Sequence, residues 1–322
     1  MVQLGGRIRI WYASLCSGIF KTRKVIILKN KFTNSVVSAK GGRIGGKMKR
    51  IIIIVLAFLM ALSLFTGCAG KSNKVLRVGM ECAYAPYNWT QPTDVNGAVQ
   101  INSSKDFAYG YDVMMAKYLA EKMGYSLEIH KMDWDSLPMA VQSGTIDCAI
   151  AGQSITAKRL MTLDFTTPYY YASIVCLVKG DSKFASASGI SGLSGAVCTS
   201  QLNTVWYDVC LPQIQSANIL PAMETAPAML VSLVSGTCDL VVTDMPTAMA
   251  AVSVYPELKL LDFTGMSDNF EVSDEEINIG ISLKKGNAEL LGALNDALRS
   301  LTVDDFESMM NDAIKVQPLE MS

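Results

Sequence analysis

Apolar and polar residues follow one another in blocks along residues 75–316, and these blocks have the lengths of strands and helices. Val75–Met80 is a short apolar run that predicts a strand, and Leu127–Met132 predicts a second one. Between them, apolar residues recur at helical spacing from Tyr111 to Gly124, where the glycine suits the left-handed residue that ends a helix. This alternation of strands and helices predicts an α/β fold.

Residues 132–171 combine a helix, a buried strand, a polar loop and the start of another helix. Asp135 and Ser136 suit a helix N-cap, and Gly144 suits the end of the same helix. Cys148–Ala151 then has neither charge nor alternation. This pattern is expected of a central parallel strand that is covered on both faces.

A small polar loop follows this strand and leads into the next helix. The loop runs from Gly152 to Thr156, and Ala157–Arg159 opens the helix. Backbone N–H groups and a guanidinium therefore converge where the strand stops, and open α/β sheets bind their ligands at such strand ends. We expect this end of the strand to hold a ligand.

One passage of the sequence is echoed by a second passage. Ser143–Ile150 reads SGTIDCAI, and Ser235–Val242 reads SGTCDLVV. Each run leads into a loop that carries a polar ligand candidate, which is Asp244 in the second case. The repeat predicts two lobes of one architecture.

The order of the predicted elements indicates how the chain divides between the lobes. We expect residues 75–171 and 277–322 to form the first lobe and residues 172–276 the second. The chain then crosses between the lobes twice, near Tyr171 and near Glu276. Two crossover strands of this kind form a hinge. Residues 91–109 are rich in Asn, Ser, Asp and Gly and predict a surface loop or hairpin.

The charge of the chain is distributed unevenly. The 322 residues have a formal net charge of −1, but twelve Lys or Arg residues precede Cys68 and no Asp or Glu precedes Glu81. From Cys68 onward, 16 basic residues stand against 29 acidic ones, a net charge of −13. This balance argues against nucleic acid or an anionic membrane surface as the partner.

The N-terminal region has the pattern of an export signal. Met48-Lys49-Arg50 and the apolar run that follows match the basic and apolar regions of a signal peptide. Gly67 directly before Cys68 resembles the bacterial lipoprotein signal, which implies that Cys68 is lipidated. We expect residues 48–67 to be a lipoprotein signal peptide and 68–74 a lipidated tether. The alternative is an uncleaved transmembrane anchor, although the run is short for a span.

Residues 1–47 are basic and contain no acidic residue. We expect them to be a non-native leader upstream of the true start at Met48, with an unusually long n-region as the alternative. The cysteines downstream of Cys68 form neither a CxxC pair nor a Cys/His spacing, so the sequence predicts no metal site and no cofactor. We expect mostly free thiols.

A series of short motifs resembles the polar amino-acid-binding proteins of ABC importers, solute-binding family 3. The motifs are Gly110-Tyr111-Asp112-Val113, Asp135, Gln142-Ser143-Gly144, Ala151-Gly152, Ser154-Ile155-Thr156, Arg159, Phe165 and Pro168-Tyr169-Tyr170. The resemblance covers the chain from about Val75 to the C-terminus. It implies a two-lobe, type II periplasmic-binding-protein-like fold that closes on a free amino acid and presents it to a membrane permease.

A free amino acid needs donors for its carboxylate and an acceptor for its ammonium. Arg159 supplies planar bidentate donors, and a solvated helix residue is its alternative interpretation. Ser154, Thr156 and Ser200 add hydroxyl and N–H groups at helix starts, where such residues are also common caps.

Asp244 is the predicted acceptor for the ammonium, with the carbonyl of Gly152 beside it. Asp244 also suits the cap of the helix that begins near Pro246. The resemblance implies that Tyr84 and Trp134 clasp the substrate side chain. It also implies that Glu81 faces its distal part, so we expect Arg, Lys or His first, Gln or another neutral polar residue second, and Glu or Asp last.

Two functions other than transport binding are compatible with this fold. A dehydratase-like enzyme and a ligand-sensing lobe of a signalling system are the alternatives. His130 is the only histidine, and no Ser/His/Asp or Cys/His arrangement is available around it. The sequence therefore predicts no catalytic residues and a lipid-anchored binding protein outside the cell membrane.

Overall fold

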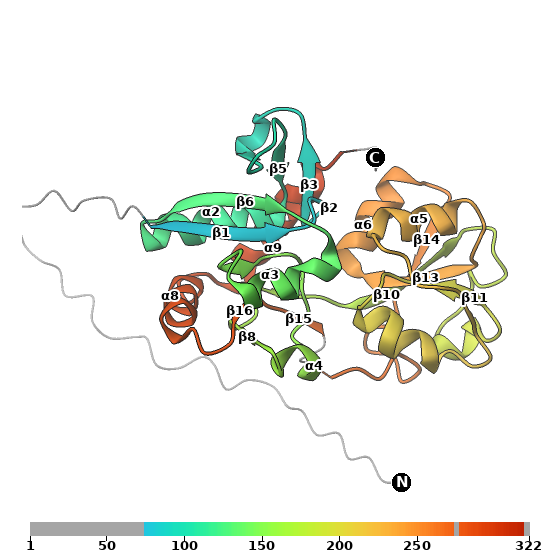
Figure 1. Cartoon of the computed structure of the whole chain (residues 1–322). Helices are drawn as coiled ribbons and strands as arrows, with labels where there is room; N and C mark the ends of the chain where they lie inside the picture. The colour runs from blue at the N-terminus through green and yellow to red at the C-terminus, as the bar shows by residue number, and fades with distance from the viewer. Residues whose placement is uncertain (1–73, 274–276, 319–322) are drawn as a thin grey trace, which may run out of the picture. The chain divides into compact units, whose positions relative to one another are not determined.

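A five-stranded mixed sheet forms the core of the first lobe in the computed structural model, which describes residues 74–273 and 277–318 (Figure 1). Its strand order is β6-β1-β7-β16-β8. The strands are β1 (Val75–Met80), β6 (Ser126–Lys131), β7 (Cys148–Ala149), β8 (Leu163–Phe165) and β16 (Ser282–Lys284). β1 runs parallel to β6 and β7, whereas β16 runs antiparallel to β7 and β8. The predicted first strand is confirmed. β7 is central, but it is parallel to only one neighbour because the chain returns from the second lobe in the opposite direction.

Helices cover the first sheet. They are α2 (Tyr111–Met123), η2 (Trp134–Ser136), α3 (Leu137–Ser143), α4 (Ala157–Leu160), α8 (Ala288–Leu298) and α9 (Val303–Val316). Gly124 ends α2 with φ 69°, and Gly144 ends α3 with φ 79°, so both predicted left-handed stops are confirmed. α2 packs against α8 and α9, which brings the C-terminal helices back to the first lobe.

A small four-stranded sheet stands beside the first sheet. Its strands are β2 (Ala83–Tyr84), β3 (Asn88–Gln91), β4 (Val99–Gln100) and β5 (Phe107–Tyr109), in the order β2-β3-β5-β4, with η1 (Val95–Gly97) between β3 and β4. It lies at the top of Figure 1. Ile101 bridges to Ile129 in β6. The segment predicted as a loop or hairpin therefore forms part of an ordered sheet.

The second lobe contains its own five-stranded sheet, in the order β12-β11-β13-β10-β14. The strands are β10 (Ile174–Lys179), β11 (Val197–Thr199), β12 (Asn218–Ile219), β13 (Leu240–Asp244) and β14 (Leu258–Leu261). Its helical segments are η3 (Ile190–Leu193), η4 (Trp206–Cys210), η5 (Leu211–Gln213), α5 (Ala226–Val234) and α6 (Met245–Val254). The buried strand before Asp244 and the helix start near Pro246 are confirmed.

Two short strands connect the lobes. β9 (Tyr170–Tyr171) and β15 (Asn278–Ile279) pair in antiparallel orientation, with Tyr171 opposite Asn278. One belongs to the outgoing chain and the other to the returning chain. The two crossover strands expected from the element order are therefore present, although Glu276 itself lies outside the described residues.

The repeated sequence passages adopt the same local structure. Gly144 and Gly236 both have φ 79°. The Asp147 carboxylate accepts the Arg77 N–H at 2.8 Å, and the Asp239 carboxylate accepts the Val197 N–H at 2.9 Å. In return, each aspartate N–H donates to the carbonyl of the same partner. Each aspartate therefore fastens the start of its strand to the neighbouring strand.

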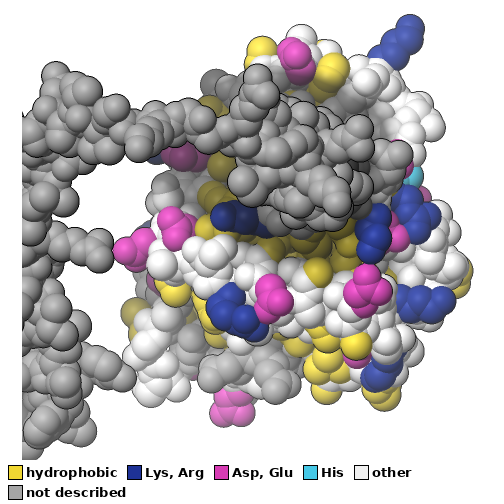
Figure 2. All heavy atoms as spheres, turned by 90° about the vertical axis from the view of Figure 1, so that its left-hand side faces the viewer, with side chains coloured by type: hydrophobic (Ala, Val, Ile, Leu, Met, Phe, Trp, Pro, Cys, Tyr) yellow, Lys and Arg dark blue, Asp and Glu magenta, His cyan; other side chains and the backbone are white. Residues whose placement is uncertain are grey.

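The predicted leader, the predicted signal peptide, Cys68 and most of its tether lie outside the residues that the structure describes. On the face in Figure 2, basic and acidic side chains are interspersed. Within residues 74–273 and 277–318, no helix is long and apolar enough to cross a membrane. The cysteines at positions 82, 148, 176, 198, 210 and 238 are buried, and none of these six forms a disulfide.

Candidate functional site

Strand ends from both lobes meet at a small cavity. It is lined by six of the nine predicted ligand residues, Glu81, Tyr84, Trp134, Gly152, Ser154 and Arg159, and by Gln201, Thr204 and Trp206. Glu81 follows β1, Gly152 lies beyond β7, and Gln201 lies beyond β11. The cavity therefore lies at the ends of strands from both sheets, as in other open α/β folds.

Arg159 is held firmly at one side of this cavity. Its guanidinium donates to the carbonyl of Ser154 at 2.7 Å and to the carbonyl of Asn203, in the second lobe, at 2.9 Å. It also lies over the ring of Trp134, 5.3 Å from the centroid. Burial lowers its pKa to about 10, so it remains a cation at neutral pH. This environment differs from that of a solvated helix residue.

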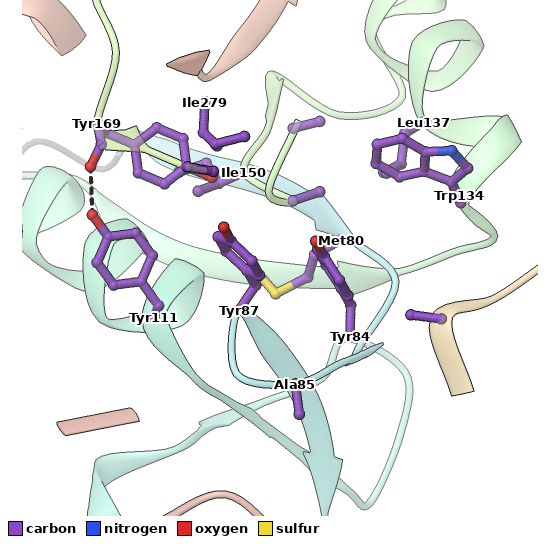
Figure 3. Packing of buried hydrophobic residues seen from close by; sticks show 14 of the residues in the cluster. Met80, Tyr84, Ala85, Tyr87, Tyr111, Trp134, Leu137, Ile150, Tyr169 and Ile279 are labelled. Carbon is purple, nitrogen blue, oxygen red and sulfur yellow. Dashed lines mark hydrogen bonds between the residues drawn. The ribbon is translucent and has the colours of Figure 1, made fainter. Parts of the chain in front are cut away.

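Asp244 caps the helix that follows it and also accepts a hydrogen bond from the first lobe. Its Oδ1 accepts the Thr247 N–H at 2.8 Å and caps α6, while its Oδ2 accepts the Tyr84 hydroxyl at 2.5 Å. Tyr84 lies in the first lobe and stacks on Tyr87 with centroids 4.7 Å apart (Figure 3). Burial raises the pKa of Asp244, and its hydrogen bonds oppose that shift. The carboxylate lies directly behind a residue that lines the cavity.

Thr156 and Ser200 hold backbone in place and do not line the cavity. The Thr156 hydroxyl accepts the Arg159 N–H at 3.2 Å, which caps α4. The Ser200 hydroxyl is buried and donates to the carbonyl of Val242 at 2.7 Å, within the second sheet. The structure therefore brings Thr156 close to the site through Arg159 and leaves Ser200 in the core of the second lobe.

Glu81 is a buried carboxylate between two cavities. It is only 5% exposed, and the Gln201 amide donates to it at 3.3 Å. Burial, with added repulsion from Asp133 and Asp112, raises its pKa to about 7. On its other side lies a second cavity of about 270 Å³. Its charged lining residues are Glu81, Lys131, Asp133, Asp135 and Glu224. Four of these five are acidic, so this side of Glu81 favours a cation.

Three lining residues were not predicted from the sequence: Gln201, Thr204 and Trp206. The Thr204 hydroxyl donates to the carbonyl of Gln201 at 2.7 Å. Trp206 lies at an angle to Tyr84, with ring centroids 6.4 Å apart. The sequence predicted a polar turn after β11 and indicated Ser200 as its ligand residue, because serine is a common cap residue. The register of the turn, which decides the side chains that face the cavity, is not visible in the sequence.

Hydrogen bonds between the lobes close the cavity. Tyr84 and Arg159 donate across it, the Trp134 indole N–H donates to the carbonyl of Leu202 at 3.0 Å, and Gln201 donates back to Glu81. The remaining free volume is about 10 Å³, roughly the room of one water molecule. An amino acid needs more space, so it can enter only when the lobes or these side chains move apart.

Residues 76–311 match the family model of the bacterial extracellular solute-binding proteins, family 3. The chain belongs to this family. A relative, the probable histidine-binding protein of Neisseria gonorrhoeae, is 26% identical over 234 residues, 72% of this chain and 80% of that protein. The L-cystine-binding protein TcyJ of Escherichia coli is 26% identical over 258 residues, 76% of this chain and 89% of that protein.

Solved structures of this family share the fold. The amino acid ABC transporter substrate-binding protein AbpA from Streptococcus pneumoniae, bound to L-arginine, aligns with a TM-score of 0.64 and 25% identity. The alignment covers 76% of this chain and 96% of that one. The type II periplasmic-binding-protein fold is therefore confirmed, and the family and these relatives are binding proteins.

Proposed function

We propose that this protein is the extracytoplasmic binding component of an ABC importer and that it captures a free amino acid between its lobes for delivery to a membrane permease. One observation carries the proposal: the guanidinium of Arg159, from the first lobe, lines one closed cavity, and the carboxylate of Asp244, from the second lobe, accepts the hydroxyl of Tyr84, which lines the same cavity. A zwitterion offers the complementary pair of charges. Binding-protein relatives named for histidine and cystine, and a neighbour bound to L-arginine, support the ligand class.

The backbone of the ligand would contact groups from both lobes. A guanidinium has five N–H donors, more than the two used by the carbonyls of Ser154 and Asn203, so Arg159 can also bind a carboxylate. The ligand ammonium would take the place of the Tyr84 hydroxyl on Asp244, with the Gly152 carbonyl as a second acceptor. Thr156 and Ser200 support this arrangement through the backbone bonds described above.

The side chain of the ligand would point toward Glu81, between Tyr84 and Trp134. A cation there replaces the weak Gln201 contact and faces the acidic second cavity, whereas an acidic side chain meets like charge. We therefore propose a cationic amino acid, with a neutral polar one such as glutamine as the second choice.

Closure would couple binding to transport. Contacts from both lobes form together only in the closed arrangement, so the ligand must favour that arrangement over an open one. β9 and β15 would act as the hinge. In this proposal the protein binds and releases its ligand and catalyses no reaction.

The test combines titration calorimetry of the purified protein against the twenty amino acids with small-angle scattering. We expect at least one amino acid to bind and the radius of gyration to decrease at saturation. If no amino acid binds, the proposed function is wrong. If one binds with an unchanged radius, hinge closure is wrong.

We also propose that residues 48–67 direct export, that Cys68 carries the lipid of an anchored lipoprotein, and that residues 1–47 are not part of the native protein. The predicted lobe limits, 75–171 with 277–322 and 172–276, belong to the same proposal. In a Cys68→Ala variant, we expect the protein to leave the membrane fraction. If this variant stays with washed membranes as the parent does, the apolar run itself is the anchor.

A further inference from the structure

Asp112 carries a buried carboxylate that lies outside the ligand cavity. This carboxylate accepts hydrogen bonds from two side chains, and each of these is hydrogen-bonded in turn to a segment at the cavity. Asp112 lies in the first turn of α2 and is fully buried. Its Oδ2 accepts the Asn88 side-chain N–H at 2.7 Å, and its Oδ1 accepts the Tyr169 hydroxyl at 2.7 Å. Asp112, Asn88 and Tyr169 do not line the ligand cavity.

The Asn88 side chain links Asp112 to the residue that follows Glu81. The Asn88 side-chain oxygen accepts the Cys82 N–H at 2.7 Å, and Cys82 directly follows Glu81. Cys82 has φ 54°, a left-handed conformation that residues with a side chain rarely adopt. Asn88 therefore stabilises the unusual turn that directs the chain from β1 past the cavity.

The second bond extends to Gly152. The Tyr169 hydroxyl accepts the Gly152 N–H at 3.1 Å, and Gly152 lines the cavity. Tyr169 directly precedes the crossover strand β9, and its own N–H donates to the carbonyl of Ile279 at 2.9 Å. The neighbouring Tyr111 hydroxyl donates to the Tyr169 carbonyl (Figure 3). This second chain of hydrogen bonds therefore also contacts the hinge.

The two series of hydrogen bonds run in the same direction from donor to acceptor, and both end at Asp112. In each, a cavity-lining segment donates an N–H to a side chain, which donates its own hydrogen to Asp112. An ionised carboxylate can accept both terminal hydrogens, whereas an amide of the same shape can accept only one and presents a donor to the other. The charge of Asp112 therefore sets the direction of every hydrogen bond in the network.

We infer that Asp112 is a positioning residue for ligand binding, which holds the turn after Glu81 and the Gly152 loop at a fixed separation at the neighbouring ends of β1 and β7, on the first-lobe side of the cavity. This inference rests on the proposed function. A buried polar network of this kind specifies a unique arrangement only when every member is satisfied. Loss of one partner therefore displaces one of these two cavity-lining segments relative to the other.

The test is a swap of the two side-chain types. In Asp112→Asn, the introduced N–H group meets either the Asn88 N–H group or the Tyr169 hydroxyl hydrogen, and we expect arginine affinity to fall at least tenfold. In Asn88→Asp, two carboxylates face each other, and we expect a comparable loss. In the double variant, the introduced carboxylate at position 88 accepts the N–H groups of Cys82 and of the introduced amide at position 112. The amide oxygen at 112 then accepts the Tyr169 hydroxyl, so we expect affinity within threefold of the parent.

Two controls separate positioning from general destabilisation. Met115→Ala, at a buried position on the same helix, should lower stability by leaving a cavity and leave arginine affinity unchanged. Amide hydrogen exchange at Cys82 and Gly152 should be faster in Asp112→Asn and return toward the parent rate in the double variant, without any ligand.

The outcomes are distinct. Parent protein that binds none of arginine, lysine and histidine contradicts the proposed cationic ligand, and the exchange rates then decide the present inference alone. If lysine or histidine binds and arginine does not, that ligand replaces arginine in the affinity series. Asp112→Asn with arginine affinity within twofold of the parent, unchanged exchange at both amides, or a folded double variant that is as weak as the single ones would overturn the role of Asp112.

Discussion

Ser143–Ile150 and Ser235–Val242 begin alike and end differently. In both, a left-handed glycine ends a helix and an aspartate fastens the next strand to its neighbour. After β7, the chain continues through the Gly152 loop to the short α4 with Arg159. After β13, it turns directly into α6, with Asp244 as the cap. The shared motif places a strand, and the residues beyond it decide which charge that strand end presents.

The largest expected effect is on ligand affinity and comes from changing Arg159 or Asp244, the charged residues that lie beyond β7 and at the end of β13. Asp244→Asn keeps an oxygen for the Thr247 N–H and removes the charge, and Arg159→Lys removes the planar donors. Each change leaves a ligand charge poorly paired in a closed cavity, so calorimetry should show affinity weakened by about 2–5 kcal/mol.

Asp244→Ala is the matched comparison, because it also loses the cap and should lower stability by a further ~1 kcal/mol. Affinity within twofold of the parent in a folded Asp244→Asn or Arg159→Lys variant would remove that residue from the site.

Asp244 and Glu81 are buried carboxylates at two strand ends, and their surroundings lead to a prediction for how stability depends on pH. Asp244 accepts two short hydrogen bonds, whereas Glu81 has the longer Gln201 contact and a pKa raised to about 7 from 4.5. A carboxyl group whose pKa is higher in the folded than in the unfolded protein stabilises the folded state at low pH. This contribution is lost as pH rises through the folded pKa. Without ligand, ionisation of Glu81 alone should lower the free energy of unfolding by roughly 2–3 kcal/mol between pH 4 and pH 8.

Urea unfolding at a series of pH values measures the total change. The difference between the parent and Glu81→Gln isolates the contribution of Glu81, because Asp112 and Asp244, whose pKa values burial also raises, are present in both proteins. Cation affinity should follow the opposite trend and rise with pH as Glu81 ionises. Equal pH slopes of stability in the parent and in Glu81→Gln would contradict the assignment to Glu81.

A smaller effect tests what the two passages share. Asp147→Ala and Asp239→Ala each leave a strand N–H without its acceptor, so each should lower the free energy of unfolding by about 1–2 kcal/mol. Both aspartates lie at the opposite end of their strands from the ligand cavity, so ligand affinity should be unchanged. A variant that unfolds at the parent's urea midpoint would show that its aspartate does not fasten the strand.

Local signals explain what the sequence predicted well. Val75–Met80 and the helix ends at Gly124 and Gly144 depend on short-range patterns, namely apolar runs and glycine conformations, and the structure confirms them. The repeated passage also predicted equivalent structures, because its hydrogen bonds involve the motif itself and one neighbouring strand.

The site residues depend on tertiary geometry. Ser200 and Thr204 are both plausible cap residues, but the register of the turn after β11 directs only Thr204 to the cavity. Trp206 carries no ligand chemistry that would identify it in a sequence. Asp112 belonged to a recognised motif, yet its connection to Gly152 becomes visible only when Tyr169 is placed between them.

The most direct test of the central claim is a competition titration of the parent protein and of Glu81→Gln with arginine, lysine, histidine, glutamine, glutamate and aspartate at pH 8. The account predicts that the cationic amino acids bind the parent most tightly and the acidic ones most weakly. Glu81→Gln should reduce or remove this ranking by weakening the cationic ligands. If glutamate or aspartate binds the parent more tightly than arginine, lysine and histidine, the proposed role of Glu81 is wrong.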